Sequence, residues 1–336
     1  MSIYSVVIPT YGRNEFLTGC LESIERQTVT PKEVFIIDNN NNPDYQESVK
    51  DIIRKFPSTK VKFSYHKGLI NSGAVARNHG ASLVTTDLVA FLDDDVVVDV
   101  DYYEKIIEVF KSNNEVVGVQ GLDRSLIESF DKNVRKNLMG KILLSLENFF
   151  EHTSITKGKR SDLSPSLAVM HPIPDIDFHV ESQWISTCAG VFKTSLFNFI
   201  EFPKHFVKYS WNEYVFFSYS IYKKKLGTMI YTSNAKYRNI PTDAGRLPLK
   251  DLVYMSEVYD FYIFSELFNR NLLDKIIYIK SRIGRILFYI LRMVKRKQFD
   301  FRLLASALNA FYFTFSNRRE IRKGNFECYN QKFPLN

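Results

Sequence analysis

The sequence predicts an α/β fold in which a mainly parallel sheet is covered by helices. Short apolar runs alternate with segments of helical period through the first 120 residues, and this alternation is typical of a doubly wound sheet. The length of 336 residues, with 45% hydrophobic and 24% charged residues, is enough for one large or two modest domains. Polar residues follow several of the apolar runs, at the sheet edge where such folds bind ligands.

Strands are expected where short runs rich in Val, Ile and Phe end at proline or at a polar residue. These runs are residues 5–10, 33–37, 61–66, 88–92 and 116–120. Helices are expected between them, where apolar residues recur at three- and four-residue spacing. These segments are residues 16–27, 45–56, 74–83 and 102–111. Further along, we expect a helix at 138–150, a loop at 153–177 that contains a glycine and three prolines, and helices over 250–316.

Three aspartates, Asp93, Asp94 and Asp95, follow the apolar run at residues 88–92. Like charges so close together repel, so the cluster needs a counter-ion or at least one raised pKa. Mg²⁺ or Mn²⁺ typically bridges such carboxylates to a phosphate. In an extended segment, residues two apart point to the same side, so Asp93 and Asp95 are the expected metal ligands, with Asp95 the first choice. A solvated acidic loop without function is the alternative.

The three cysteines, Cys20, Cys188 and Cys328, lie far apart in the sequence. They form neither a disulfide framework nor a zinc motif, which favours a reducing compartment. No signal peptide and no uncharged apolar run of about 18 residues is visible. These observations predict a cytoplasmic protein without a transmembrane helix.

The net charge of +8 is concentrated in Lys and Arg residues of the last third of the chain, which suggests an anionic partner. One stripe of the predicted C-terminal helix consists of Ile276, Ile279, Ile283, Ile286, Leu287, Ile290 and Val294. Mostly off that stripe lie Arg282, Arg285, Arg292, Lys295 and Arg296. Such a helix can lie on an anionic membrane, or it can pack on the domain with a solvated basic face. Nucleic acid is not expected, because no exposed stacking aromatics accompany the basic residues.

Four motifs in order within 95 residues resemble family 2 glycosyltransferases of the GT-A fold. They are VVIPTYGR at 6–13, FIIDNN at 35–40, NSGAVARNHG at 71–80 and FLDDD at 91–95. The resemblance is good over residues 3–120, moderate over 184–240 and absent beyond about 250. The Asp-Asn-Asn variant of the second motif is similar to rhamnosyltransferase-like members. The resemblance implies a metal-dependent, inverting enzyme that uses a nucleotide sugar, UDP- or dTDP-linked rather than GDP-linked.

The donor site implied by these motifs has two parts. The loop of Pro9, Thr10, Tyr11 and Arg13 presents backbone groups at a strand end, where a flat base could dock. Asp38 could accept a hydrogen bond from a ring N–H of uracil or thymine, and an Asx-turn is its alternative role.

The second part is a loop of small residues that opens a helix. Its expected donor contacts are Asn71, Gly73, Arg77 and Asn78, since a helix N-terminus and an arginine both favour an anion. The alternative is a tightly packed helix start with Arg77 in a structural ion pair. Asp93 and Asp94 complete the predicted donor contacts.

The acceptor side resembles the family only partly. Glu213, in the stretch Trp-Asn-Glu-Tyr at 211–214, is the expected general base for an acceptor hydroxyl, and a helix-capping carboxylate is the alternative. The reserve candidates are Asp175, Asp177 and Glu181. Relatives often have a histidine after the last strand, which this sequence lacks, so Arg238 and Arg246 are expected to contact the diphosphate instead.

These residues predict a glycosyltransferase domain at 1–245, with a nucleotide-binding half at 1–120 and an acceptor half at 121–245. A basic helical region at 246–336 is expected to bring the enzyme to the inner face of the cell membrane. There it would act on a saccharide or lipid-linked saccharide in surface polysaccharide assembly. Two alternatives stay open. One is a nucleotidyltransferase, although the first loop is a poor phosphate loop. The other is a non-catalytic relative that binds a nucleotide or a partner.

Overall fold

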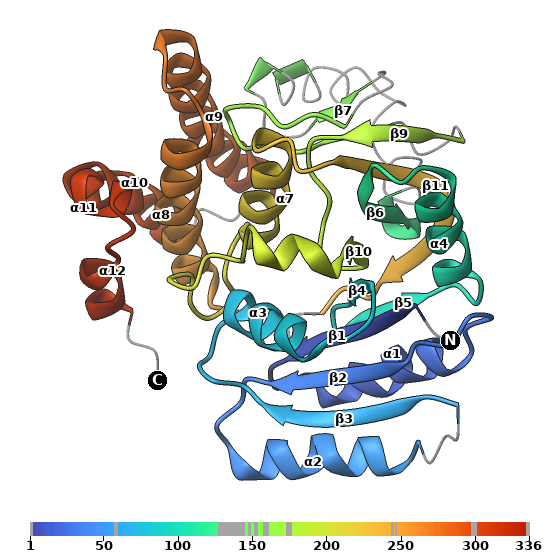
Figure 1. Cartoon of the computed structure of the whole chain (residues 1–336). Helices are drawn as coiled ribbons and strands as arrows, with labels where there is room; N and C mark the ends of the chain where they lie inside the picture. The colour runs from blue at the N-terminus through green and yellow to red at the C-terminus, as the bar shows by residue number, and fades with distance from the viewer. Residues whose placement is uncertain are drawn as a thin grey trace.

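The computed structural model of the chain describes residues 3–56, 60–126, 145–146, 149–150, 154–156, 161–172, 177–242, 245, 247–296 and 301–333. Its central sheet has the strand order β3-β2-β1-β4-β10-β6-β11-β5, and β9 pairs with β11 (Figure 1). Helices flank the sheet. The α/β class predicted from the sequence is therefore confirmed.

The first half of the sheet is parallel, as predicted. β1 (Tyr4–Thr10) lies between β2 (Glu33–Asp38) and β4 (Leu88–Phe91), and β2 also pairs with β3 (Lys62–Lys67). The helices of this half are α1 (Asn14–Glu25), α2 (Pro43–Arg54), α3 (Gly73–Leu83) and α4 (Tyr102–Ser112). All lie within a few residues of the predicted segments, because each strand is a local apolar run and each helix has its own amphipathic period.

Side-chain caps explain two of the helix starts. The Asn42 side chain accepts a hydrogen bond from the Asp44 amide at 2.9 Å, and Pro43 occupies the first turn of α2. The Ser72 hydroxyl accepts from the Val75 amide at 3.1 Å at the start of α3. Both caps satisfy amides that the helix itself leaves unpaired. The start of α3 is thereby fixed beside the ends of β1 and β4.

The second half of the sheet is mixed, which corrects the expectation of a mainly parallel sheet. β10 (Gly190–Lys193) runs antiparallel between β4 and the predicted strand β6 (Val116–Asp123). β11 (Thr228–Asn239) is parallel to β6 but antiparallel to β5 (Val96–Val98) and β9 (His179–Ser182). These short antiparallel strands come from distant parts of the chain. They are not joined by the helical crossovers that make parallel strands recognisable in a sequence.

The segment predicted as a loop at 153–177 contains two strands. β7 (Ser154–Thr156) and β8 (Met170–Pro172) pair in parallel as a small separate sheet. The prolines misled the prediction, because proline is compatible with the end of a short edge strand. Of the predicted helix at 138–150, the structure describes residues 145–146 and 149–150 alone, and residues 145, 146 and 149 are helical.

Helices follow the last strand of the sheet, as predicted, and two further helical segments come just before that strand. A short 3₁₀ helix (Thr194–Asn198) and α7 (Glu213–Lys223) precede β11. After β11 come α8 (Leu249–Leu267), α9 (Leu272–Arg296), α10 (Phe301–Ser316), α11 (Arg318–Arg322) and α12 (Glu327–Lys332). Figure 1 shows α8 to α12 gathered on one side of the sheet. Buried residues of α8 such as Met255 and Val258 belong to the same apolar cluster as Val7 of β1 and Phe217 of α7. The C-terminal helices are thus continuous with the core of the sheet.

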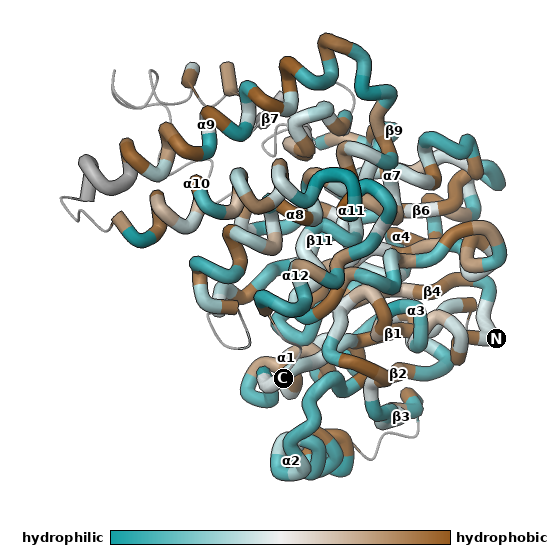
Figure 2. The backbone as a smooth tube through the Cα atoms, turned by 90° about the vertical axis from the view of Figure 1, so that its left-hand side faces the viewer, coloured by the Kyte–Doolittle hydropathy of each residue, from teal (hydrophilic) through white to brown (hydrophobic). Residues whose placement is uncertain are grey.

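The orientation of α9 reverses the expectation for its arginines. The side chains of Arg282 and Arg285 are only 3% and 15% exposed. On the stripe, Ile276, Ile279 and Ile283 are 53%, 50% and 56% exposed. The basic face at these two arginines is therefore buried, and it is the apolar stripe that reaches the surface. Apolar residues recur along α9 and α10 in Figure 2. None of the helices in the described part of the chain is long and apolar enough to span a bilayer.

Candidate functional site

A cavity of about 480 Å³ opens where the C-terminal ends of β1 and β4 meet the starts of α3 and α7. The parallel register explains the meeting point, since Thr10 at the end of β1 pairs with Asp38 and Val7 pairs with Phe91 of β4. Among the predicted site residues that the structure describes, Asp38, Asn78, Arg238 and the reserve candidates Asp177 and Glu181 do not line it. Those that do are Pro9, Thr10, Tyr11, Arg13, Asn71, Gly73, Arg77, Asp93, Asp94, Asp95 and Glu213.

Asp38 is buried and does not line the cavity. Its Oδ1 accepts a hydrogen bond from the Asn40 amide at 2.9 Å, and the Tyr65 hydroxyl donates to its Oδ2 at 3.3 Å. The first contact is the Asx-turn that the sequence offered as an alternative. Burial raises the pKa of Asp38, and the Asn40 amide opposes that shift. The neighbouring Asn39, not predicted, is the residue of this motif that lines the cavity.

Asn78 does not face the donor site, which corrects its assignment. Its side chain donates to the Phe202 carbonyl and accepts from the Phe202 amide, both at 2.9 Å. Asn78 therefore holds the loop at Phe202, which is distant in the sequence, against α3. Asn78 directly follows Arg77 in the sequence. Successive side chains of a helix point about 100° apart, so the two residues face different directions from α3.

Arg13 holds the second and third aspartates. Its Nη1 lies 2.7 Å from Asp95 Oδ2 and 3.3 Å from Asp94 Oδ1. The Thr10 hydroxyl donates to Asp94 Oδ2 at 2.6 Å. Burial raises the pKa of Asp94 to about 7, although Arg13 and Thr10 pull it down. Asp94 is thus fixed by partners on β1 and its loop, which suits a residue that shapes the site.

The three aspartates lie on a turn and not on an extended segment. The Val96 amide donates to the Asp93 carbonyl at 3.1 Å, which closes the turn. Because of this turn, Asp93 has a different counter-ion from the other two, and Arg77 Nη2 donates to its Oδ1 at 2.6 Å. The Asp93 side chain is 27% exposed, against 4% for Asp94 and 6% for Asp95. Asp93 is therefore the most open of the three carboxylates.

Arg77 links the aspartates to the candidate base. Its Nη1 lies 3.0 Å from Glu213 Oε1, while Nη2 holds Asp93. Arg77 is 7% exposed, so this ion pair is largely shielded from water. The sequence offered a structural ion pair as the alternative to a donor contact, and the structure places Arg77 in such a pair at the cavity wall.

Glu213 is the first residue of α7 and is 6% exposed. Burial raises its pKa to about 7, and the nearby Arg77 charge limits the rise. A carboxyl with this pKa exchanges its proton near neutral pH, which is what a general base requires. The reserve candidates Asp177 and Glu181 lie outside the cavity, and Asp175 and Arg246 are outside the described residues.

Several cavity residues were not predicted. They are Asn39, Ser186, Thr187, Cys188, Lys208, Tyr209, Trp211, Asn212, Tyr214, Asn239, Gly245 and Leu247. Most of them lie within residues 184–240, where the sequence resembles the family only moderately and predicts Glu213 as the expected site residue. Lys208 had no signal in the sequence, since it reaches the site by a backbone bridge to Ser72. Arg238, the predicted diphosphate contact, does not line the cavity, although its neighbour Asn239 does.

The donor atoms around the cavity suit a hard cation. Asp93 and Asp95 offer carboxylate oxygens, which Mg²⁺ and Mn²⁺ prefer, and such ions often take one or two carboxylates plus substrate phosphates. Within the described residues, no three His, Cys, Asp or Glu side chains are grouped as a metal site. The fit is thus to a cation that a bound diphosphate would share.

Comparison with known proteins gives the family. Residues 5–173, just over half of the chain, match glycosyl transferase family 2. The chain is 28% identical over 251 residues to the poly(ribitol-phosphate) beta-N-acetylglucosaminyltransferase TarP of Staphylococcus aureus, and the match covers 70% of this chain and 76% of that protein. Six other curated relatives are matched over only 13% to 37% of their own length, and the protein EpsH of Bacillus subtilis is matched over 68% of its length at 22% identity.

Solved structures give the fold. GalNAc-T7, solved with UDP, GalNAc and Mn²⁺, superimposes with a TM-score of 0.53 at 14% identity, over 85% of this chain and 55% of that one. The mannosyltransferase PcManGT of Pyrobaculum calidifontis, in complex with GDP-Man and Mn²⁺, gives 0.52 at 11% identity, over 92% and 85%. The shared fold is the GT-A fold. The match over residues 5–173 establishes that the chain belongs to glycosyl transferase family 2.

Proposed function

We propose that this protein transfers a glycosyl group from a UDP- or dTDP-linked sugar to an acceptor hydroxyl, with inversion at the anomeric carbon. The observation that carries the proposal is the convergence of Asp93, Asp95 and Glu213 on one cavity in a chain of this family. The arginines Arg13 and Arg77 at the same cavity supply positive charge beside the expected diphosphate.

Glu213 takes the proton of the acceptor hydroxyl as that oxygen attacks the anomeric carbon. Arg77, 3.0 Å away, favours the ionised carboxylate and fixes its direction. Asp93 and Asp95 would hold Mn²⁺ or Mg²⁺, which neutralises charge on the departing nucleoside diphosphate. Arg13, which pairs with Asp94 and Asp95 at the cavity, could also contact the diphosphate, because a guanidinium pairs with phosphate as well as with carboxylate.

The acceptor is proposed to belong to cell-surface polysaccharide assembly. TarP, which aligns over 70% of this chain, is named a poly(ribitol-phosphate) beta-N-acetylglucosaminyltransferase. The three cysteines are free, and Cys328 is exposed, which suits a cytoplasmic site of action. We therefore propose a hydroxyl-rich saccharide or polyol-phosphate acceptor, lipid-linked at the inner face of the membrane.

Peripheral membrane contact is proposed through α9 and α10. Exposed apolar side chains are concentrated there: Leu272, Leu273, Ile276, Ile279, Ile283, Ile290, Phe301, Leu308, Phe311, Tyr312 and Phe315. Exposed cations such as Lys275 and Arg302 accompany them. An apolar helical face with neighbouring cations favours an anionic lipid surface. Sedimentation with vesicles tests this: we expect binding to anionic vesicles that Ile279→Glu weakens, and equal binding to neutral vesicles would contradict the charge argument.

A thermal-shift panel with UDP, dTDP, GDP and CMP, each with and without Mn²⁺, tests the donor site. A ligand that binds only the folded state raises the free energy of unfolding by about 2.7 kcal/mol when its concentration is a hundredfold above Kd. We expect a metal-dependent shift with UDP or dTDP that is lost in Asp95→Asn. Asp99→Asn is the matched control, since Asp99 pairs with Arg124 outside the cavity.

The outcomes of this panel are distinct. A shift without Mn²⁺ of equal size would contradict the metal role, and a preference for GDP would contradict the choice of base. No shift with any of the four nucleotides would favour the non-catalytic alternative. The anomeric configuration of the product, measured by NMR, tests inversion.

A further inference from the structure

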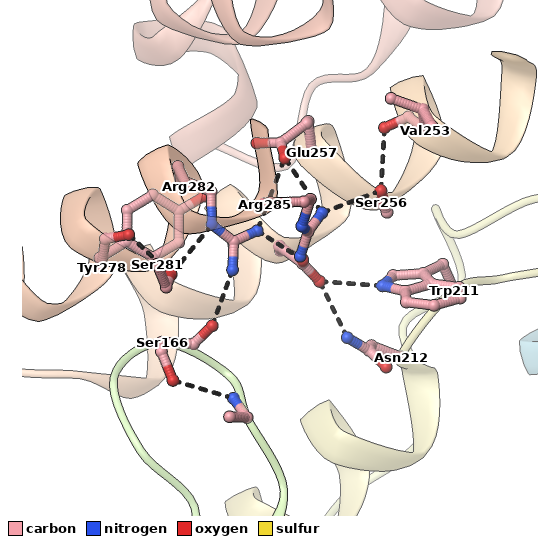
Figure 3. Close-up of polar contacts among 12 residues, drawn as sticks. Ser166, Trp211, Asn212, Val253, Ser256, Glu257, Tyr278, Ser281, Arg282 and Arg285 are labelled. Carbon is pink, nitrogen blue, oxygen red and sulfur yellow. Dashed lines mark hydrogen bonds and ion pairs between the residues drawn. The ribbon is translucent and has the colours of Figure 1, made fainter. Parts of the chain in front are cut away.

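A buried cluster of four charges joins α8 to α9. Arg282 Nη1 and Arg285 Nη2 each donate to Asp260 Oδ2 at 2.8 Å, and Arg285 Nη1 lies 3.0 Å from Glu257 (Figure 3). Asp260 is 1% exposed and Glu257 is 5% exposed. Burial raises the pKa of Asp260, but Arg285 and Arg282 outweigh burial and hold that pKa below its ordinary value. Asp260 is therefore an ionised carboxylate in the protein interior.

The second oxygen of Asp260 reaches the wall of the active-site cavity. Its Oδ1 accepts hydrogen bonds from Trp211 Nε1 at 3.0 Å and from Asn212 Nδ2 at 2.8 Å. Figure 3 labels Trp211 and Asn212, and dashed lines mark these two hydrogen bonds. Trp211 and Asn212 line the cavity and immediately precede Glu213. One carboxylate thus joins α8 and α9 to the segment that carries the candidate base.

The backbone at Asn212 needs such an anchor. Its φ of 59° lies in the left-handed region, where asparagine is tolerated better than most residues. Asn212 occupies the cap position of α7, yet its side chain makes no capping bond to the helix and binds Asp260 instead. The direction in which Glu213 leaves the start of α7 therefore depends on a contact with α8.

We propose that Asp260, held by Arg282 and Arg285, is a positioning residue that fixes Glu213 at the cavity wall. The C-terminal helices would then complete the acceptor side of the site, in addition to any role at a membrane. This inference rests on the proposed role of Glu213 as base. It predicts a specific loss of turnover when the contact between Asp260 and the 211–212 segment is broken.

The test compares Asp260→Asn with Glu257→Gln. Both variants remove one carboxylate from the same buried cluster, but Glu257 pairs with Arg282 and Arg285 rather than with Trp211 or Asn212, so it controls for instability. We expect kcat of Asp260→Asn to fall about 100-fold, as misplaced catalytic groups typically cause. The donor KM and the Mn²⁺-dependent thermal shift with UDP should stay unchanged. Glu257→Gln should keep kcat near that of the native chain. Equal losses in both variants, or no loss in Asp260→Asn, would overturn the proposal.

A second measurement does not depend on turnover. The chain has two tryptophans, Trp184 and Trp211, so 5-fluorotryptophan labelling gives two ¹⁹F resonances, which Trp184→Phe assigns. The Trp211 resonance should move in Asp260→Asn and stay in place in Glu257→Gln. If Asp260→Asn does not fold, Asn212→Gly removes the hydrogen bond without backbone strain and should lower kcat at constant donor KM. Unchanged kcat there would overturn the proposal, whereas an inactive native chain with the expected ¹⁹F shift would count against the proposed function alone.

Discussion

The Arg77 guanidinium lies 3.0 Å from Glu213 and 2.6 Å from Asp93, and so pairs with one carboxylate on each side of the cavity. One buried cation thereby couples Asp93, a proposed donor-side residue, to Glu213, the proposed base. A charge brought near Asp93, such as a metal ion, would change how strongly Arg77 stabilises the ionised carboxylate of Glu213. If Asp93 binds the donor side and Glu213 is the base, as proposed, donor binding and the ionisation of the base are linked by this contact.

The pH dependence of turnover should follow Glu213. Its pKa is about 7 because burial raises it and Arg77 opposes the rise. The base acts in its ionised form, so kcat/KM should fall as the pH drops through about 7. Arg77→Gln removes the charge that favours ionisation and should move this limb to higher pH. A limb at the same pH in Arg77→Gln would show that another group titrates.

Replacing the base should separate chemistry from binding. Glu213→Gln keeps the size of the side chain but cannot accept the proton, so kcat should fall by about 10²- to 10⁴-fold. The thermal shift with UDP and Mn²⁺ should be retained, because Glu213 is not among the predicted donor contacts. Glu181→Gln on β9, outside the cavity, is the matched control. Full turnover in Glu213→Gln would remove Glu213 as the base.

Stability should also depend on the protonation of Glu213. Its pKa in the folded protein, about 7, lies above the ordinary value of 4.5, so the folded state binds the proton more tightly than the unfolded state. The resulting stabilisation is complete below about pH 4.5 and is lost as the pH rises through about 7, a change on the order of 3 kcal/mol. Urea unfolding in metal-free buffer at pH 5 and pH 8 should show a smaller difference for Glu213→Gln than for the native chain. An unchanged difference would contradict a raised pKa.

Most of the first half of the fold could be predicted because its signals are local. The runs before Asp38 and Asp93 are recognisable as buried strands, and the parallel sheet brings their ends together without further information. Residues at those ends, Asn39 and Asp93 to Asp95, therefore line one cavity, although Asp38 itself does not. Asn78 was assigned wrongly because its partner, Phe202, is 124 residues away.

The second half depends on contacts that no local pattern encodes. Arg282 and Arg285 appear in the sequence as part of a solvated basic face, since their partners Asp260 and Glu257 lie on a different helix. Periodicity identifies the two faces of α9 but not which of them faces inward. The apolar face is usually the buried one, but in α9 buried ion pairs turn the face with Arg282 and Arg285 inward. The same holds for Lys208, whose place in the site follows from its bridge to Ser72.

The buried cluster predicts a large cost for removing one arginine. Arg282→Met leaves Asp260 with less compensation in the interior, and such losses typically cost about 3–5 kcal/mol. Lys105→Met is the surface control, because its pair with Asp101 is over a third exposed on both sides and pairs of that kind contribute about 0–1 kcal/mol. Urea unfolding measures both. Similar small effects in the two variants would mean that the interior cluster is hydrated.

Two glycines should respond in opposite ways to alanine. A Cβ at Gly80 in α3 would lie 2.2 Å from Val7 Cγ1 of β1, whereas nothing lies within 4 Å of a Cβ at Gly19 in α1. Gly19→Ala should stabilise the protein by about 0.5–1 kcal/mol, because alanine loses less backbone entropy in a helix. Gly80→Ala should instead cost about 1–3 kcal/mol, since α3 must move away from β1. That movement would also displace Arg77, so nucleotide binding should weaken in Gly80→Ala and stay unchanged in Gly19→Ala. Equal stabilisation by both substitutions would contradict the close packing of α3 on the sheet.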